Sequence, residues 1–226
     1  QWFYFLMKVW IISLPVLWMW LVDREKPGLS PARHGGLGVG ALFGLVIAAV
    51  ILITYWLIGP KLIDAQLVRD AATRNGIGTP MRFLALTVPL ALVNSLIEEY
   101  VWRWFVFRKC EVPVGGRAAV VVSALFFTLH HIFALMMQMP WTITALATLG
   151  VFIGGCVWSW CYLKYRSIWP GYVSHIIADI AVFTVGWTIL FGTPTNSTDN
   201  HRNSEQTHVL EASGDVRVRP PLAFNG

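Results

Sequence analysis

The chain has 226 residues, of which 56% are hydrophobic and only 13% are charged, and its mean hydropathy is +0.59. A soluble domain carries about 25% charged residues, so this composition excludes an ordinary soluble protein and indicates a multi-span membrane protein. The formal net charge of +5 comes from basic residues crowded into loops, where Lys and Arg set membrane topology, so we expect no nucleic-acid partner.

Long apolar segments follow one another along most of the chain. A membrane-spanning helix needs about 20 predominantly apolar residues. We therefore expect an all-α, polytopic transmembrane helix bundle of about six spans with one short interfacial helix. The predicted spans are approximately residues 2–22, 37–59, 81–107, 118–138, 141–163 and 168–191.

Residues 61–80 interrupt this pattern between the second and third spans. Apolar Ile63, Leu67 and Ala71 recur at a spacing of four among charged residues, which predicts a short amphipathic helix lying in the membrane interface. Charged residues with Pro and Gly predict polar loops, and these are residues 23–36 and 108–117.

The chain divides into three parts on this reading. Residues 1–80 hold the first two spans and the interfacial helix, residues 81–191 form the membrane core, and residues 192–226 form a polar tail that we expect to be disordered. Loops one, three and five are richer in Lys and Arg than the other side, so the positive-inside rule places them in the cytoplasm. We expect an integral, multi-pass protein, in the plasma or inner membrane if the source is bacterial.

Ionisable residues inside the predicted spans are the most informative feature of the sequence. A charge at the centre of a bilayer costs at least about 2.5 kcal/mol, so such residues are functional candidates by default. Of the twelve acidic residues and six histidines, those inside spans are Glu98, Glu99, Asp179, His130, His131 and His175.

Helix geometry separates the two adjacent glutamates. Glu99 and Arg103 are four residues apart with the acid first, which favours an ion pair on one helix face. Glu98 is rotated by about 100° from Glu99. Glu98 is therefore left out of that pair and can face a cavity.

The intramembrane histidines also differ by helix face. Ser123, Phe127 and His131 recur every four residues on one stripe, whereas His130 lies on an adjacent face, where we expect a hydrogen bond to a neighbouring helix. On the last span, His175 and Asp179 are four residues apart, and a carboxylate there can fix the imidazole tautomer.

Glu98, His131, His175 and Asp179 lie at similar depths on three spans, so they can converge on one cavity. A carboxylate and a histidine around one water predict general-base activation of that water, or a metal-bound water with Glu98, His131 and His175 as ligands. The implied reaction is peptide-bond cleavage within the membrane. A proton or ion pathway would use the same residue types.

Three motifs, each on its own span, resemble those of the CPBP family over roughly residues 81–190. They are Glu98-Glu99-x-x-x-Arg103, Phe127-x-x-x-His131 and His175-x-x-x-Asp179. This family comprises intramembrane endopeptidases of glutamic or metal-dependent type, including type II CAAX prenyl proteases and bacteriocin-processing or self-immunity proteins.

The resemblance implies a role for each motif residue. Glu98 and His131 would activate the water, and His175 with Asp179 would form the oxyanion side. The supporting residues would be Glu99 and Arg103, which hold the first motif, and Phe127, which shapes the pocket. The last motif position is Asn or Asp in the family, so the carboxylate of Asp179 changes the charge relative to an Asn.

The resemblance leaves several alternatives open. The partners it implies are the lipid bilayer and a membrane-associated or lipidated protein or peptide substrate. Zn or another divalent metal is one option and a metal-free mechanism is the other. A non-proteolytic immunity or scaffold protein of the same fold, or a proton-coupled transporter, would also account for the polar cluster, although the halves of the chain show no inverted repeat.

Overall fold

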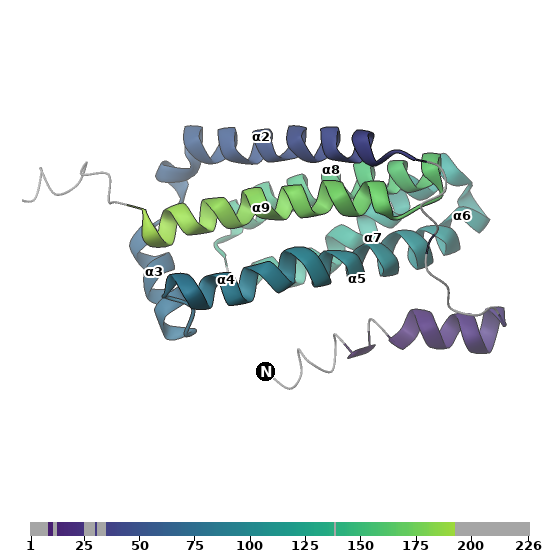
Figure 1. Cartoon of the computed structure of the whole chain (residues 1–226), viewed down its shortest axis with the longest axis horizontal. Coiled ribbons are helices and arrows are strands. Elements are labelled where there is room, and N and C mark those ends of the chain that lie inside the picture. Colours follow the sequence, from purple (N-terminus) through teal and green to yellow (C-terminus); the bar gives the residue numbers. More distant parts are fainter. Residues whose placement is uncertain (1–8, 11–12, 25–29, 31–34, 138, 193–226) are drawn as a thin grey trace, which may run out of the picture. The chain divides into compact units, whose positions relative to one another are not determined.

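The computed structural model describes residues 9–10, 13–24, 30, 35–137 and 139–192 (Figure 1). These ranges are almost entirely helical and contain no strand, which confirms the predicted all-α class. Five helices of the described residues are long and apolar enough to cross a membrane: α2 (Leu37–Leu62), the composite helix Pro80–Val114, α7 (Gly116–Met136), α8 (Trp141–Tyr165) and α9 (Trp169–Phe191).

The first predicted span is described only in part. Its second half is a short apolar helix, Ser13–Asp23, which ends in the π-helical segment η1 (Met19–Asp23). Met19 is buried against a cluster that includes Trp104 and Phe107. Residues 2–8 of the predicted span, most of the predicted loop 23–36 and the predicted disordered tail beyond Gly192 lie outside the described residues.

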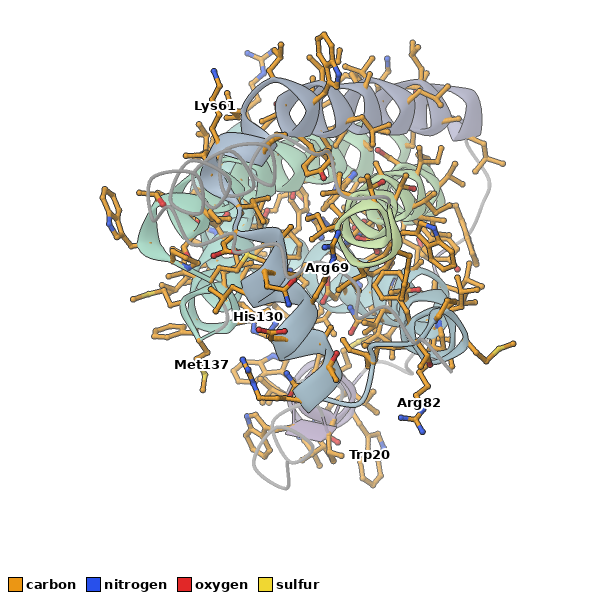
Figure 2. All side chains as sticks on the ribbon, turned by 90° about the vertical axis from the view of Figure 1, so that its left-hand side faces the viewer. Trp20, Lys61, Arg69, Arg82, His130 and Met137 are labelled. Atoms are coloured by element: carbon orange, nitrogen blue, oxygen red, sulfur yellow. The ribbon has the colours of Figure 1, made fainter. Side chains whose placement is uncertain are left out.

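A short helix is present where the sequence predicts the amphipathic segment. It is α3 (Ala65–Arg74), and the side chain of Asp64 caps its start by accepting hydrogen bonds from the backbone N–H groups of Gln66 and Leu67 at 2.9 and 3.1 Å. Arg69 on α3 donates through Nε to the carbonyl of Ile189, 2.9 Å away, near the end of α9 (Figure 2). The helix is thus tied to the last turns of α9.

The composite helix Pro80–Val114 carries the first motif and changes winding along its length. It consists of α4 (Pro80–Pro89), η2 (Leu90–Asn94), α5 (Ser95–Glu99), η3 (Tyr100–Phe107) and α6 (Arg108–Val114), of which η2 and η3 are π-helical. Segments of π-helix are rare and occur frequently at functional sites. Here they flank the short α-helical segment that holds the two glutamates.

The predicted loop at residues 108–117 is wrong. The chain stays helical through Val114, and only Gly115, with a φ of +78°, interrupts it before α7. Arg108, Lys109 and Glu111 are charged, but such residues have good helix propensity, so they extend the helix rather than end it. Glu111 also accepts two hydrogen bonds from Arg166, which fixes this end of the helix beside the turn after α8.

Glycines set how closely α2 approaches α9, and Figure 1 shows the two helices side by side. A Cβ at Gly40 would overlap the backbone carbonyl of Pro170, and one at Gly44 would lie 2.9 Å from Cα of Ser174. Gly40 and Gly44 are four residues apart, which is the small-residue spacing that lets membrane helices pack closely. This pattern was not predicted from the sequence. The close packing at these glycines fixes the position of the first half of α9, which carries His175.

Gly40→Ala is therefore expected to destabilise the protein by about 1–3 kcal/mol, because an added methyl group in a close-packed contact forces the backbones apart. Gly38→Ala is the matched control, since a Cβ at Gly38 meets nothing within 4 Å. Unfolding of both variants in mixed micelles would be compared with that of the parent chain. Equal stability of the two variants would contradict close packing at Gly40.

Candidate active site

The structure brings together all four residues expected to carry chemistry, with Glu98 at the centre and Asp179 beside His175. Glu98 on α5 places Oε2 3.9 Å from Nε2 of His131 on α7 and 3.8 Å from Nε2 of His175 on α9. These separations are too long for direct hydrogen bonds and fit one bridging water. Glu98 and His175 are buried, with exposed side-chain fractions of 9% and 6%, whereas that of His131 is 24%, so the cluster opens on the His131 side.

Both imidazole rings are oriented by a hydrogen bond at Nδ1. Nδ1 of His131 lies 3.0 Å from the carbonyl oxygen of Phe127, and Nδ1 of His175 lies 3.0 Å from Oε1 of Glu99. A carbonyl or carboxylate oxygen only accepts, so each Nδ1 carries a proton and donates it. Each Nε2 is thereby directed at the Glu98 carboxylate, as is usual where a histidine binds a metal or acts as a base.

The partner of His175 differs from the expected one. Asp179, four residues along α9, places Oδ1 3.9 Å from Nε2 of His175 and makes no direct hydrogen bond to it. Glu99 instead fixes the ring, because α5 and α9 approach closely at Gly171, where a Cβ would lie 2.5 Å from Oε2 of Glu99. Asp179 accepts a hydrogen bond from Ser95 at 2.5 Å and remains partly exposed beside the cluster.

The predicted ion pair of Glu99 and Arg103 is present and fully buried. Nη1 of Arg103 lies 3.1 Å from Oε1 of Glu99. The guanidinium group also lies 4.4 Å from the ring centroid of Phe127 and 5.1 Å from that of Trp158, which are cation–π distances. Arg103 therefore holds Glu99, and Glu99 in turn holds His175.

Phe127 occupies the centre of the aromatic packing around the cluster. Its ring centroid lies 4.3 Å from that of His131 and 6.2 Å from that of His175, and the residue is 1% exposed. On the same stripe of α7, Ser123 pairs with Ser159 of α8 through their hydroxyl groups at 3.0 Å. The predicted stripe thus faces the interior along its length.

His130 lies on the adjacent face of α7, as expected. Its ring centroid is 5.5 Å from that of Trp102 and 5.3 Å from that of His131. It lines a small cavity of about 160 Å³ together with Leu14 and Pro15 of the N-terminal helix. His130 thus lies beside Trp102 and the N-terminal helix.

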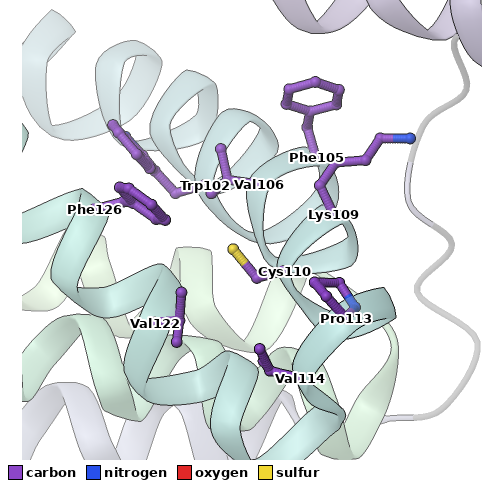
Figure 3. A pocket seen from close by; sticks show the side chains of 9 residues that line it. All are labelled: Trp102, Phe105, Val106, Lys109, Cys110, Pro113, Val114, Val122 and Phe126. Carbon is purple, nitrogen blue, oxygen red and sulfur yellow. The ribbon is translucent and has the colours of Figure 1, made fainter.

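A larger apolar pocket of about 480 Å³ opens between η3, α6 and α7 (Figure 3). Figure 3 shows Trp102 and Phe126 at one end and Lys109, Pro113 and Val114 towards the other. Trp102 also packs against Phe127, with 5.7 Å between ring centroids. Trp102 thus separates this pocket from the aromatic packing around the cluster.

Asn94 is a site residue that the sequence reasoning missed. Its Nδ2 donates to Oε1 of Glu98 at 2.8 Å, which occupies one carboxylate oxygen and leaves Oε2 facing the two histidines. Asn94 and Glu98 are four residues apart, so their spacing was a usable signal. Trp158 was also missed, because an aromatic residue in an apolar span carries no such signal.

We expect Asn94→Leu to lower the rate of any reaction that uses Glu98 by about 10-fold. Without the hydrogen bond from Asn94, the carboxylate of Glu98 is no longer held in one orientation. The side chain keeps its approximate volume, so the fold should persist. Asn75→Leu is the matched control, since Asn75 bonds only to the carbonyl of Ala71 at the surface end of α3. Equal rates for the two variants would show that Asn94 does not orient Glu98.

The metal hypothesis stays a prediction. Within the described residues, no group of three or more His, Cys, Asp or Glu side chains is arranged to hold a metal ion. Glu98, His131 and His175 are nevertheless donors of the type that zinc takes, and both histidine Nε2 atoms face the carboxylate. The donor chemistry therefore suits a metal, while the arrangement does not form a closed ligand set.

Comparison with protein families gives one match, to the model described as type II CAAX prenyl endopeptidase Rce1-like, over residues 80–181. Comparisons with curated proteins and with solved structures give no match. The matched segment contains every residue of the three motifs and begins with the composite helix. The match confirms the resemblance to the CPBP family over residues 80–181, which are similar to the Rce1-like model.

Proposed function

We propose that this integral membrane protein is an endopeptidase that hydrolyses a peptide bond of a membrane-associated or lipidated protein or peptide. The observation that carries the proposal is the convergence of two Nε2 atoms on one carboxylate oxygen of Glu98, at 3.8 and 3.9 Å. Separations of this length suit a water that is hydrogen-bonded to both a carboxylate and a histidine. The Rce1-like match supports the same reaction class.

Glu98 acts as the general base in this proposal. Its carboxylate removes a proton from the water held near His131, and the water oxygen attacks the carbonyl carbon of the scissile bond. The proton then passes from Glu98 to the leaving nitrogen as the C–N bond breaks. The products are a carboxylic acid and an amine, between which the second water proton then distributes, and Glu98 returns to its starting state.

His175 is placed to stabilise the oxyanion when it carries a proton on both nitrogens. Carboxylate oxygens of Glu98, Glu99 and Asp179 lie 3.8, 3.0 and 3.9 Å from its ring nitrogens, and negative charges at these distances stabilise an imidazolium. Nδ1 then donates to Glu99 and Nε2 donates to the developing oxyanion. A fixed donor in a buried site is worth about 2.7–4 kcal/mol of transition-state stabilisation.

The proposal is tested with purified protein in lipid vesicles and a quenched fluorescent peptide, offered with and without a lipid anchor. We expect the parent chain to cleave the peptide, and Glu98→Ala and His131→Ala to lose cleavage while retaining their melting temperatures. His130→Ala is the matched control, because it removes the neighbouring imidazole, which packs against Trp102 and lines the small cavity beside the N-terminal helix. Full cleavage by both Glu98→Ala and His131→Ala would eliminate the mechanism.

Metal dependence is tested on the same preparation. If a divalent metal is bound, Glu98, His131 and His175 would hold it and it would supply Lewis acidity to the water. Elemental analysis of the purified protein should then show close to one equivalent, and a chelator should abolish cleavage until zinc is added back. Cleavage that persists in metal-free protein would establish the metal-free mechanism.

A further inference from the structure

Trp158 of α8 stacks on His175, although none of the four residues expected to carry chemistry comes from α8. The ring centroids lie 3.9 Å apart and the ring planes are inclined by 16°. Trp158 is 5% exposed and His175 is equally buried. The imidazole is therefore covered on one face by an indole that solvent does not reach.

The indole is itself held at two points. Its Nε1 donates to the hydroxyl of Ser174 at 3.0 Å, and Ser174 directly precedes His175 on α9. At the other end of the ring, Gly154 leaves the space that the six-membered ring fills, because a Cβ there would lie 3.2 Å from it. The plane of the indole is thus fixed relative to the backbone that carries His175.

This contact constrains a motion that the hydrogen bond to Glu99 leaves free. The ring torsion of a histidine has a broad, roughly two-fold profile, and a bond at Nδ1 alone permits the ring to swing about that bond. Stacking fixes the ring plane. Nε2 then keeps its aim at Glu98, 3.8 Å away, and at Asp179, 3.9 Å away.

The same indole also contacts a cation. The guanidinium of Arg103 lies 5.1 Å from the ring of Trp158 and 4.4 Å from that of Phe127. The attraction between a cation and an aromatic face helps to hold the indole in place.

We propose that Trp158 is a positioning residue for the hydrolysis, acting through His175 by fixing its ring plane. This rests on the proposed function. Trp158→Leu is expected to lower kcat by about 10- to 100-fold, the effect of misplacing a reacting group by about 1 Å, with KM changed by less than about 2-fold. Trp158→Phe keeps an aromatic face and should restore kcat to within about 5-fold of the parent.

Trp160 provides the matched control on the same helix. It is 37% exposed, packs against Phe43 with 5.7 Å between ring centroids, and lies beside Lys164. Trp160→Leu removes the same mass from α8 without touching His175, so its kcat should equal that of the parent. If Trp160→Leu lowers kcat as much as Trp158→Leu, the effect belongs to α8 as a whole and the proposal is overturned.

A spectroscopic measurement tests the stacking independently of activity. In full-length protein with isotope-labelled histidine in nanodiscs, the ring current of the indole should move the Hε1 signal of His175 upfield, and the signal is assigned by its loss in His175→Gln. Trp158→Leu should abolish the upfield shift, Trp158→Phe should retain part of it, and Trp160→Leu should leave it unchanged.

The two kinds of failure are distinguishable. A parent chain that cleaves no reporter peptide overturns the proposed function, and the His175 signal then decides the stacking by itself. An unshifted His175 signal in the parent, or an unchanged signal and kcat in Trp158→Leu, overturns the role assigned to Trp158. Melting temperatures of all variants separate these results from loss of the fold.

Discussion

Glu98→Gln is expected to lower kcat by about 10²- to 10⁴-fold, the range typical for loss of a general base. The amide has nearly the same shape, and its oxygen can still accept the hydrogen bond from Asn94 that now ends on Oε1. It cannot take a proton from water. Because shape is conserved, we expect KM and the melting temperature to change little, and the loss to fall on kcat.

Glu111→Gln is the control for this substitution. Glu111 is a carboxylate on the same composite helix, but it binds Arg166 through two hydrogen bonds at 2.6 and 2.7 Å, away from the cluster. Its kcat should equal that of the parent. A Glu98→Gln variant that keeps a cellular phenotype while Trp102 or Phe127 substitutions abolish it would favour the non-proteolytic scaffold alternative.

Arg103→Met is expected to destabilise the protein by about 3–5 kcal/mol, because removing one partner of a buried ion pair leaves the other charge uncompensated. Arg103 and Glu99 are both fully buried, and Glu99 would keep only His175 as a partner. Met keeps part of the packing against Phe127 and Trp158. The loss of stability should therefore come mainly from the unpaired charge of Glu99. The measurement is unfolding in mixed micelles.

The exposed pair of Arg166 and Glu111 is the control for the buried pair of Arg103 and Glu99. Arg166 lies in the turn after α8, outside the spans, and its hydrogen bonds to Glu111 raise the pKa of the guanidinium. Exposed pairs contribute about 0.2–1 kcal/mol, so Arg166→Met should cost far less than Arg103→Met. The double variant Glu99→Gln with Arg103→Met should recover stability, because it removes both buried charges. Equal losses at positions 103 and 166 would contradict this account.

The fold class and the meeting of the polar side chains could be predicted from the sequence because both depend on solvation. Apolar runs of sufficient length must become helices in a bilayer, and the few ionisable residues inside those runs must find partners. Glu98, His131 and His175 meet in the structure for that reason. The roles assigned to them remain predictions until activity is measured.

Contacts that depend on close approach of two helices could not be predicted in the same way. The bond from His175 to Glu99 instead of Asp179 requires the absence of a side chain at Gly171, which is not a local property of either motif. The stacking of Trp158 of α8 on His175 of α9 is also a contact between two helices, and Gly154, one turn earlier on α8, leaves the space for the indole. The four-residue separation along one helix was enough to predict the Glu99–Arg103 pair. The distance between α5 and α9 is instead set by Gly171, which is outside the three motifs.

The π-helical segments η2 and η3, on either side of the two glutamates, affect how the sequences of related chains align. A π-helical turn accommodates an extra residue relative to an α-helical turn. A relative that lacks η2 would therefore need one residue fewer between Pro80 and Glu98 to keep the carboxylate and the packing of Phe83 against Trp187 and Phe191 on their present faces. With no residue removed, the surface of α4 would turn by about 100° relative to Glu98. A one-residue gap in this stretch should thus be expected between homologues, and it would leave the carboxylate of Glu98 in place.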